Sequence, residues 1–500
     1  MENIIRYFMY DCIKNLFNTK LNLYKDTTDL AYFVLNVQEE VQELGRRFIQ
    51  DTLQEMNQLI KDMPERKNNW YVEHKGDSKK ILTSLGEVIV NKTLYTSKFE
   101  TDENGKYLEC YLLDKVLGLS PNQAMTEDVT AKIYKEAALT SYQKAGEEAT
   151  AREGVTKAAV KNILHSTRFP KNFQIPEQKR IVEYLYIDAD EDHYHLQFQS
   201  SRGDLKYNSV GRKLNGAINK IIYVFEGIEP VSPKSKRNHL INTHYFCRGS
   251  EEDNKQLWKE VFDYIENKYD TSAIKKIYVN SDGGTWIKSG YRGLADVTFV
   301  LDEFHISKYV SKLIQHTKDS EDDARSEVMA AIRDGKKSDF FEVVEKLKNC
   351  TTSEAVVQRI DSAASYISSN WTAAKYRLKK SEGVVACSAE GHVCHVLSKR
   401  MSTLPMGWCR LGGSKMARLR EYYYNGGDML ELARFQRKEI PMAAGAEEVV
   451  LSARAMLNSE RTDRSKSLIE YGKYAESIRS SISVQSSKRL SFQLNGKLKF

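Results

Sequence analysis

The sequence predicts a multidomain protein of the α+β / α/β class, in which a mixed sheet is flanked by helices. Short apolar runs typical of strands gather between residues 180 and 302, whereas the ranges on either side repeat their apolar residues at helical spacing. Strands that come first and then alternate with helices indicate a mixed sheet covered by helices. The chain has 500 residues. One hydrophobic core rarely serves more than about 300 residues, so we expect several domains.

Residues 1–118 predict a mostly helical region with a small β segment. Val37, Val41, Leu44 and Phe48 recur at helical spacing, and Pro64 marks the end of the helix. The run GEVIVNKTLYTSKF alternates apolar and polar residues, which is typical of a strand. The turn sequence DENG and the run KYLECYLLD follow, and they predict the second strand of a hairpin.

Residues 119–170 predict a second helical region that resembles a helix-turn-helix. The stretch SYQKAGEEATAREGVTKAAVKNILHST divides into two helices around Gly154, and Thr156 is the expected N-cap of the second helix. Lys157 and Lys161 would share the polar side of that helix, as in a helix that enters the major groove of DNA. An ordinary helical hairpin that packs on the core fits the same pattern.

The next ranges predict a sheet domain that is interrupted by helices. Residues 178–310 contain the strand-like runs RIVEYLYIDAD, HYHLQFQ, KIIYVFEG, HLINTHYF, KKIYVN and DVTFVLD. Residues 311–380 show only helical periodicity, which indicates an all-helical insertion. Residues 381–430 return to the sheet domain with a short strand, GVVACS, and a helix that begins near Ser388. Residues 431–500 predict a helical C-terminal region and a basic tail.

Three acidic residues end strand-like runs or begin a helix, and they are the candidate site. Asp190 ends YLYIDAD, Asp282 follows YVNS, and Glu390 lies in SAEGH. Carboxylates that converge from such rigid positions would form an oxygen-rich site for Mg²⁺. A divalent ion held there could promote attack on a phosphodiester. Asp188 would share a strand face with Asp190, so either can be the first ligand. Helix caps and solvated side chains are the structural alternative.

The charge and cysteine content of the chain indicate which partners it could bind and in which cell compartment it would fold. The net charge of +7 is small for this length, so an anionic partner must meet local basic patches. One such patch follows Glu390, and it predicts contacts with DNA phosphates from Lys399, Arg400, Arg410, Lys415 and Arg418. A solvated basic face is the alternative. No apolar run approaches the roughly 20 residues of a membrane helix. The seven scattered cysteines indicate a reducing cytoplasm.

Four long motifs carry a resemblance to a known family. They are YLYIDADEDHYHLQFQ, IYVNSDGGTWIKSG, FVLDEFHISKYV and CSAEGHVCHVLSKRMSTLPMGWCRLGGSKMARLR, and they are joined by GEVIVNKTLY and LLDKVLGLSP. Together they resemble the ISLre-type (ISL-re-two) transposases of bacterial insertion sequences, over about residues 30–430.

The resemblance implies a ribonuclease H-like catalytic domain with an Asp-Asp-Glu (DDE) triad. Carried onto this chain, the triad is Asp190, Asp282 and Glu390, and it would bind two Mg²⁺ ions, which Mn²⁺ could replace. Asp188 stays a second candidate for the first acid. The resemblance also implies an Asp-x-x-His motif, matched by Asp302 and His305. This motif either positions DNA or a flipped base beside the triad, or forms a helix cap with a satisfied His.

The implied activity is metal-dependent cleavage and transfer of DNA strands at the ends of a mobile element. The implied partners are terminal inverted repeats and target DNA, bound by a homodimer or larger assembly in the bacterial cytoplasm, at the nucleoid. Asp282 and Glu390 are 108 residues apart, and the helical insertion accounts for this gap. A ribonuclease H-like nuclease without strand transfer and an inactive DNA-binding remnant are the alternatives.

Overall fold

The computed structural model describes residues 2–120, 122–171, 175–197, 215–235, 237–249, 251–293, 296–404 and 406–437. The chain divides into two compact units. Unit 1 comprises Met1–Glu136, Tyr142–Val160 and Gln436–Phe500, and unit 2 comprises Ala137–Ser141 and Lys161–Phe435. The basic tail predicted within residues 431–500 lies outside the described residues.

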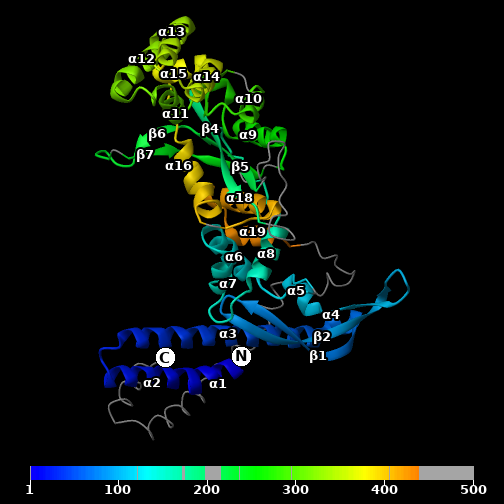
Figure 1. The fold of residues 1–500 in the computed structure, drawn as a ribbon. Coiled ribbons are helices and arrows are strands. Elements are labelled where there is room, and N and C mark those ends of the chain that lie inside the picture. The colour runs from blue at the N-terminus through cyan, green and yellow to red at the C-terminus, as the bar shows by residue number, and fades with distance from the viewer. Residues whose placement is uncertain are drawn as a thin grey trace. The chain divides into compact units, whose positions relative to one another are not determined.

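Unit 1 begins with helices, as the sequence predicts (Figure 1). They are α1 (Glu2–Tyr7), a π-helix η1 (Phe8–Cys12), α2 (Ile13–Lys25), α3 (Leu30–Asp62) and α4 (Pro64–Asn69). The long helix α3 starts at Asp29, whose side chain accepts a hydrogen bond from the Tyr32 N–H at 3.0 Å. It ends at Met63, where the backbone turns extended just before Pro64.

A three-stranded antiparallel sheet packs on α3, with the order β1 (Trp70–Thr83), β2 (Gly86–Thr101) and β3 (Tyr107–Cys110). Strand β2 confirms the predicted run, but β1 is a strand that the sequence pattern does not predict. The predicted strand KYLECYLLD is wrong beyond Cys110. Leu112 and Leu113 start helix α5 (Leu112–Leu117) instead, because both side chains are buried in the core with Trp70.

The helix-turn-helix-like stretch forms the two helices that the sequence predicts. Helix α6 (Glu127–Leu139) precedes it, and α7 (Tyr142–Glu147) and α8 (Lys157–Ser166) are its helices. The N-cap prediction is also confirmed, because Thr156 Oγ1 accepts a hydrogen bond from the Ala159 N–H at 3.3 Å. Gly146 permits the close approach of the turn, since a Cβ there would collide with the carbonyl of Val155.

Unit 2 contains the predicted mixed sheet (Figure 1). The strand order is β10-β9-β4-β5-β8. These strands are β4 (Tyr184–His195), β5 (Gly216–Phe225), β8 (His244–Gly249), β9 (Lys276–Ser281) and β10 (Val297–Leu301). Strands β4, β9 and β10 run parallel, and β5 is antiparallel to both of its neighbours. The first predicted strand and the start of the second, up to His195, form one strand, β4, because its pairing with β5 continues without a break from Tyr186 to His195; the end of HYHLQFQ lies outside the described residues.

Helices and a small hairpin surround this sheet. The hairpin consists of β6 (Gly227–Pro230) and β7 (Asn238–Ile241). Helix α9 (Asn254–Lys268) buries Trp258 and Val261 against Ile187 and Val279 of the sheet. A 3₁₀ turn (Thr271–Ala273) and α10 (Thr285–Tyr291) follow. The last helical elements are α16 (Ala389–Val393), the π-helix η4 (Cys394–Ser398), α17 (Lys399–Met401), α18 (Arg410–Tyr424) and α19 (Met429–Phe435).

The predicted all-helical insertion is present and has a hydrophobic core of its own. Its elements are α11 (Glu303–Ile314), a 3₁₀ turn η3 (Lys318–Ser320), α12 (Glu321–Asp334), α13 (Lys337–Asn349), α14 (Glu354–Ser369) and α15 (Trp371–Leu378). It begins earlier than predicted, since α11 follows β10 directly. The predicted strand GVVACS is wrong, because both edges of β4 are already paired, with β5 and β9.

Candidate active site

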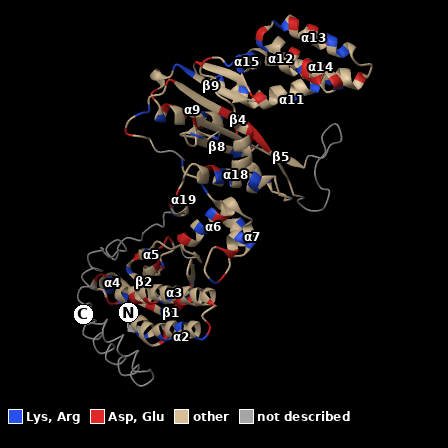
Figure 2. Ribbon diagram, turned by 90° about the vertical axis from the view of Figure 1, so that its left-hand side faces the viewer, with Lys and Arg blue, Asp and Glu red and all other residues tan. Residues whose placement is uncertain are grey.

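The parallel register brings three carboxylates to the same edge of the sheet. Asp188 on β4 lies opposite Asn280 on β9. Asp190 comes two residues later within β4, which continues to His195, and Asp282 comes directly after the end of β9. The Asp282 carboxylate is close enough to act on the pKa of Asp190. Asp302 follows β10 directly, as Asp282 follows β9. This edge is where open α/β sheets bind ligands. Figure 2 shows the acidic stretch of β4 in red.

The charges of this edge act on Asp190. Burial is the largest cause that raises the pKa of Asp190 to about 6. The Glu191 N–H donates to its Oδ1 at 2.8 Å and opposes the rise in pKa. The Asp282 and Asp302 carboxylates raise this pKa further, and His305 lowers it. Negative charge is therefore crowded here, which favours a bound cation.

Asp302 and His305 form a pair at the start of α11. Asp302 caps the helix, accepting from the Phe304 N–H at 3.2 Å, and its Oδ2 lies 3.0 Å from His305 Nδ1. Burial alone would raise the pKa of Asp302, but the hydrogen bonds from His305 and Phe304 outweigh burial and lower it. The same hydrogen bond raises the pKa of His305, and Asp282 and Asp190 add to that rise. The predicted helix cap is confirmed, and the pair also acts electrostatically on the acidic edge.

Asp188 is buried and fully engaged by donors. Its Oδ1 accepts from Asn280 Nδ2 at 2.6 Å, and its Oδ2 accepts from the Tyr223 hydroxyl at 2.7 Å and the Ser388 N–H at 3.1 Å. Burial raises the pKa of this carboxyl, and its donors oppose the rise. A carboxylate with this many protein donors serves the fold, which leaves Asp190 as the candidate acid of β4 on which the Asp282 carboxylate acts.

Glu390 begins its helix where the sequence predicts. It lies in the first turn of α16, whose N-cap is Ser388, and its side chain is exposed. The structure does not bring Glu390 together with Asp190 and Asp282. Within the described residues, no group of three or more His, Cys, Asp or Glu side chains is arranged to hold a metal ion. The hydrogen bond from Ser388 to Asp188 nevertheless fixes the start of this helix on β4.

The loop of Asp282 is supported by the helical insertion. The Tyr366 hydroxyl on α14 donates to the Asp282 carbonyl at 2.5 Å, and Lys288 Nζ donates to Asn370 Oδ1 at 2.6 Å. Gly283 has φ +83, and a Cβ there would lie 2.8 Å from Asn370 Oδ1. The sequence pattern places Tyr366 on a helix, but no local signal points it toward Asp282.

The predicted DNA-binding cations fall into two groups. Lys157 and Lys161 are exposed on α8, as a DNA-contacting face requires. Lys399 is exposed beside His395, whose Nδ1 lies 3.0 Å from its Nζ. Arg400, by contrast, is buried and donates to the Ala137 carbonyl at 3.0 Å, which argues against direct contact with DNA.

The cations of α18 lie on one helix, which carries blue positions in Figure 2. Arg410 Nη1 contacts Glu251 Oε1 at 2.7 Å, and Arg418 Nη1 lies 3.4 Å from Glu252 Oε2. Lys415 Nζ donates to the Thr167 carbonyl at 2.6 Å. Each cation therefore already has a partner within the protein, and a bound phosphate would compete with these contacts.

The fold and this edge define a class of protein, a mixed α+β protein with a five-stranded mixed sheet flanked by helices. No helix in the described ranges is long and apolar enough to span a membrane. The chain belongs to UPF0236, an uncharacterised protein family whose sequence model matches residues 23–439.

Two relatives of the same family are similar to most of this chain. A UPF0236 protein of Caldanaerobacter subterraneus subsp. tengcongensis is 33% identical over 439 residues, which cover 88% of this chain and 87% of the relative. The name of that relative joins eleven locus labels. A UPF0236 protein in a vanSb 3′ region of Streptococcus gallolyticus is 24% identical over 376 residues, covering 70% of this chain and 74% of the relative.

A solved structure, the Drosophila P element transposase strand transfer complex, also matches. It covers 60% of this chain and 79% of its own, with 8% sequence identity and a TM-score of 0.20. A likeness this low carries no inference about the fold or the activity of this chain.

Proposed function

We propose that this chain is the DDE transposase of an insertion sequence, which cuts DNA strands at the element's ends and joins them to target DNA. The observation that carries the proposal is the parallel pairing of β4 with β9, in which Asp188 lies opposite Asn280. Asp190 and Asp282 each come two residues later, and the Asp282 carboxylate acts on the pKa of Asp190. A ribonuclease H-like domain is the expected setting, and the mixed sheet with flanking helices supports it.

The donor set fits a hard divalent cation. Asp190 and Asp282 offer only carboxylate oxygens, which are the ligands that Mg²⁺ and Mn²⁺ prefer. Burial is the main cause of the raised pKa of Asp190, and repulsion by the Asp282 carboxylate adds to it; a bound cation would relieve that repulsion. Glu390, exposed in the first turn of α16, would complete the set by turning its side chain toward this edge. Two bound Mg²⁺ ions would supply Lewis acidity and a more acidic bound water or hydroxyl.

The other residues of the edge orient these three. Asp188 accepts from the Ser388 N–H and so holds the helix of Glu390 against the strand of Asp190. His305, paired with Asp302, adds positive charge beside the two acids and can face a DNA phosphate. Neither group needs to form a covalent bond with DNA.

The names of the relatives favour transposition over simple nuclease activity. One relative has a single name that joins eleven locus labels, and another joins four. A gene that recurs at many places in one genome is what a self-mobilising element produces. A housekeeping nuclease gives no reason for such repetition.

DNA binding is proposed for two surfaces. Lys157 and Lys161 on α8 would contact the terminal inverted repeats, as the exposed side of a helix in the major groove does. In unit 2, the candidates for contact with phosphates are Lys399, Arg410, Lys415 and Arg418. Two element ends must be held together for joining, so a homodimer or larger assembly is expected.

The test of this function uses the DNA that flanks the gene. Inverted repeats bounded by short direct duplications would supply the substrate, a labelled duplex that ends in one repeat. With Mg²⁺ and a plasmid, the transposase joins the labelled end to the plasmid. Cleavage without joining would identify the nuclease, and DNA binding without either reaction would identify the inactive remnant.

Removing the hydroxyl of Tyr366 tests the support of the Asp282 loop. We expect Tyr366→Phe to lower the rate of strand cleavage by roughly tenfold while the free energy of unfolding falls by only about 1 kcal/mol, the usual value of one hydrogen bond. Tyr376→Phe is the matched control, since its ring is exposed on the same insertion. Equal cleavage rates in the two variants would show that the Tyr366 contact does not position Asp282.

The raised pKa of Asp190 predicts pH-dependent metal binding in the DNA-free protein. Below pH about 6, Asp190 is protonated in the folded state, and a metal ion must displace that proton. Affinity for Mg²⁺ should therefore fall as the pH drops below about 6, by up to about tenfold per pH unit. Calorimetric titration with Mg²⁺ at several pH values measures this affinity. Asp190→Asn should bind weakly at every pH, and a wild-type affinity that is flat from about pH 7 to about pH 5 contradicts the assignment.

A further inference from the structure

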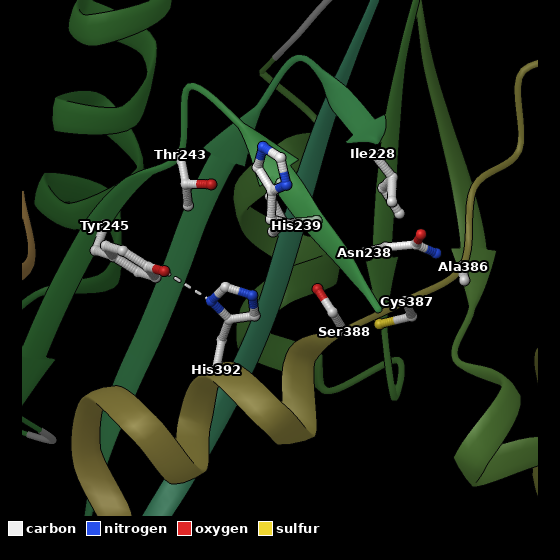
Figure 3. Close-up of a pocket in the computed structure, with 10 residues that line it drawn as sticks. Ile228, Asn238, His239, Thr243, Tyr245, Ala386, Cys387, Ser388 and His392 are labelled. Carbon is white, nitrogen blue, oxygen red and sulfur yellow. Dashed lines mark hydrogen bonds between the residues drawn. The ribbon is translucent and has the colours of Figure 1, made fainter. Parts of the chain in front are cut away.

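Unit 2 contains a cavity of about 530 Å³ beside the helix that carries Glu390. The hairpin β6–β7, the start of β8 and the extended residues 386–388 surround it, and α16 closes one side (Figure 3). Ligand sites for small molecules have volumes of roughly 300–1,000 Å³. The cavity is therefore large enough for a small organic group.

The lining is neutral, which limits what the cavity can take. None of the lining residues is a Lys, Arg, Asp or Glu. Apolar side chains form part of the wall, namely Ile228, Leu240 and Ala386. His239 contacts the Glu229 carboxylate, with 2.9 Å between His239 Nε2 and Glu229 Oε1. The charged side chain that this histidine contacts is therefore an acid. Among the described lining residues a phosphate or carboxylate would find no Lys or Arg, whereas a neutral ring would find apolar walls.

One aromatic ring in the wall is held rigidly. The imidazole of His392 stacks on Tyr223, with ring centroids 4.6 Å apart, and its Nδ1 lies 2.7 Å from the Tyr245 hydroxyl. Figure 3 shows this imidazole beside Ser388, with its other nitrogen turned away from Tyr245. Because Tyr223 and Tyr245 hold this imidazole in one orientation, it could stack on the ring of a ligand or form a hydrogen bond with the ligand's edge.

Two polar groups of the wall have no partner within the described residues. The Asn238 amide is exposed and the Thr243 hydroxyl is half-buried; both line the cavity, and neither forms a hydrogen bond with a described residue. An amide presents donors and an acceptor together, and a hydroxyl presents both as well. This mixture matches the edge of a nucleobase, where donors and acceptors alternate.

We propose that this cavity binds an unstacked nucleobase, held at its edge by Asn238 and Thr243 and against its face by His392. The inference rests on the proposed function, because Ser388 joins the cavity wall to the strand of Asp190 through its hydrogen bond with Asp188. The proposal requires that a DNA strand held at the acidic edge places one of its bases in the cavity. Enzymes that process DNA pay for unstacking a base by stacking and hydrogen bonding it in such a pocket.

The test compares two DNA duplexes that differ by one base. Each ends in a single unpaired nucleotide, which carries a thymine or adenine in one duplex and is abasic in the other. We expect wild-type protein to bind the duplex with the base roughly tenfold more tightly, within the range reported for one stacked base. Asn238→Ala and Thr243→Val should each shrink this ratio, and Asn349→Ala, an exposed Asn on the insertion, should leave it unchanged. A wild-type ratio of one overturns the proposal.

Two further measurements show whether the cavity takes a base from DNA or a free nucleoside, and whether the cavity proposal holds independently of the transposase proposal. Titration with adenosine and thymidine shows whether a free nucleoside enters the cavity, and loss of that binding in Asn238→Ala would assign it there. Wild-type protein that joins DNA ends but ignores the unpaired base refutes the cavity proposal alone. Nucleoside binding that requires Asn238, without any cleavage or joining of DNA, keeps the cavity as a base site and refutes the transposase.

Discussion

Asp282→Asn lowers the rate of DNA strand cleavage by roughly 10³-fold or more, which corresponds to about 4 kcal/mol of lost transition-state stabilisation. The amide keeps the shape of the side chain and its hydrogen bond with the Gly284 N–H, which is 2.8 Å long. It removes the charge that a divalent cation needs. Asp190→Asn is expected to have an effect of the same size, because the proposed site needs the charge of both acids to hold the cation.

The controls for this result separate catalysis from folding and DNA binding. Both variants should bind a labelled element end as tightly as the wild type, since neither acid contacts a phosphate except through a cation. Asp319→Asn, an exposed acid on the helical insertion, should cleave at the wild-type rate. An Asp282→Asn protein that keeps more than about a tenth of the activity would remove Asp282 from the site.

Asp188→Leu lowers the free energy of unfolding by about 3–5 kcal/mol, the cost of breaking a buried charged network. The change leaves the Asn280 amide, the Tyr223 hydroxyl and the Ser388 N–H without their acceptor in a fully buried place. Asn280 also accepts from Arg377 Nη2 at 2.7 Å, so the disturbance reaches the helical insertion.

Asp190→Leu is the matched comparison on the same strand. Burial already raises the pKa of Asp190 to about 6, so removing its charge should not lower stability. Chemical denaturation of the two variants measures the difference. Equal losses would mean that Asp190 is as structural as Asp188, whereas a stable Asp188→Leu protein would mean that the buried network contributes little.

Local sequence patterns predict the strands that lead to the candidate acidic residues. KKIYVN and DVTFVLD are short apolar runs that end beside Asp282 and Asp302, and both are strands in the structure. The patterns do not predict the secondary structure of segments whose conformation depends on contacts with distant parts of the chain. Residues 384–388 resemble a strand but have no free strand edge beside β4, and Leu112 prefers a helix because its side chain joins a core assembled from distant residues.

For the candidate site, too, local sequence predicts the position of each acid but not the contacts between distant segments. Strand ends can be located from the sequence, so Asp190 and Asp282 are found there, but their adjacency requires the register of β4 with β9. Alternation cannot separate Asp188 from Asp190, because the donors that engage Asp188 come from three distant segments. Tyr366 and the cavity beside α16 depend on long-range packing and leave no local signal. The position of Glu390 on its helix is predicted, yet its convergence with the two acids remains a prediction.

Crystals of the protein with a short element-end duplex and Mn²⁺, measured at a wavelength where manganese scatters anomalously, locate the metal directly. We expect an anomalous peak between Asp190 and Asp282, at about 2.1 Å from their carboxylate oxygens, with Glu390 turned toward the same ion. A strong peak elsewhere on the protein, with none at this edge, would contradict the assignment of the acidic edge as the catalytic centre.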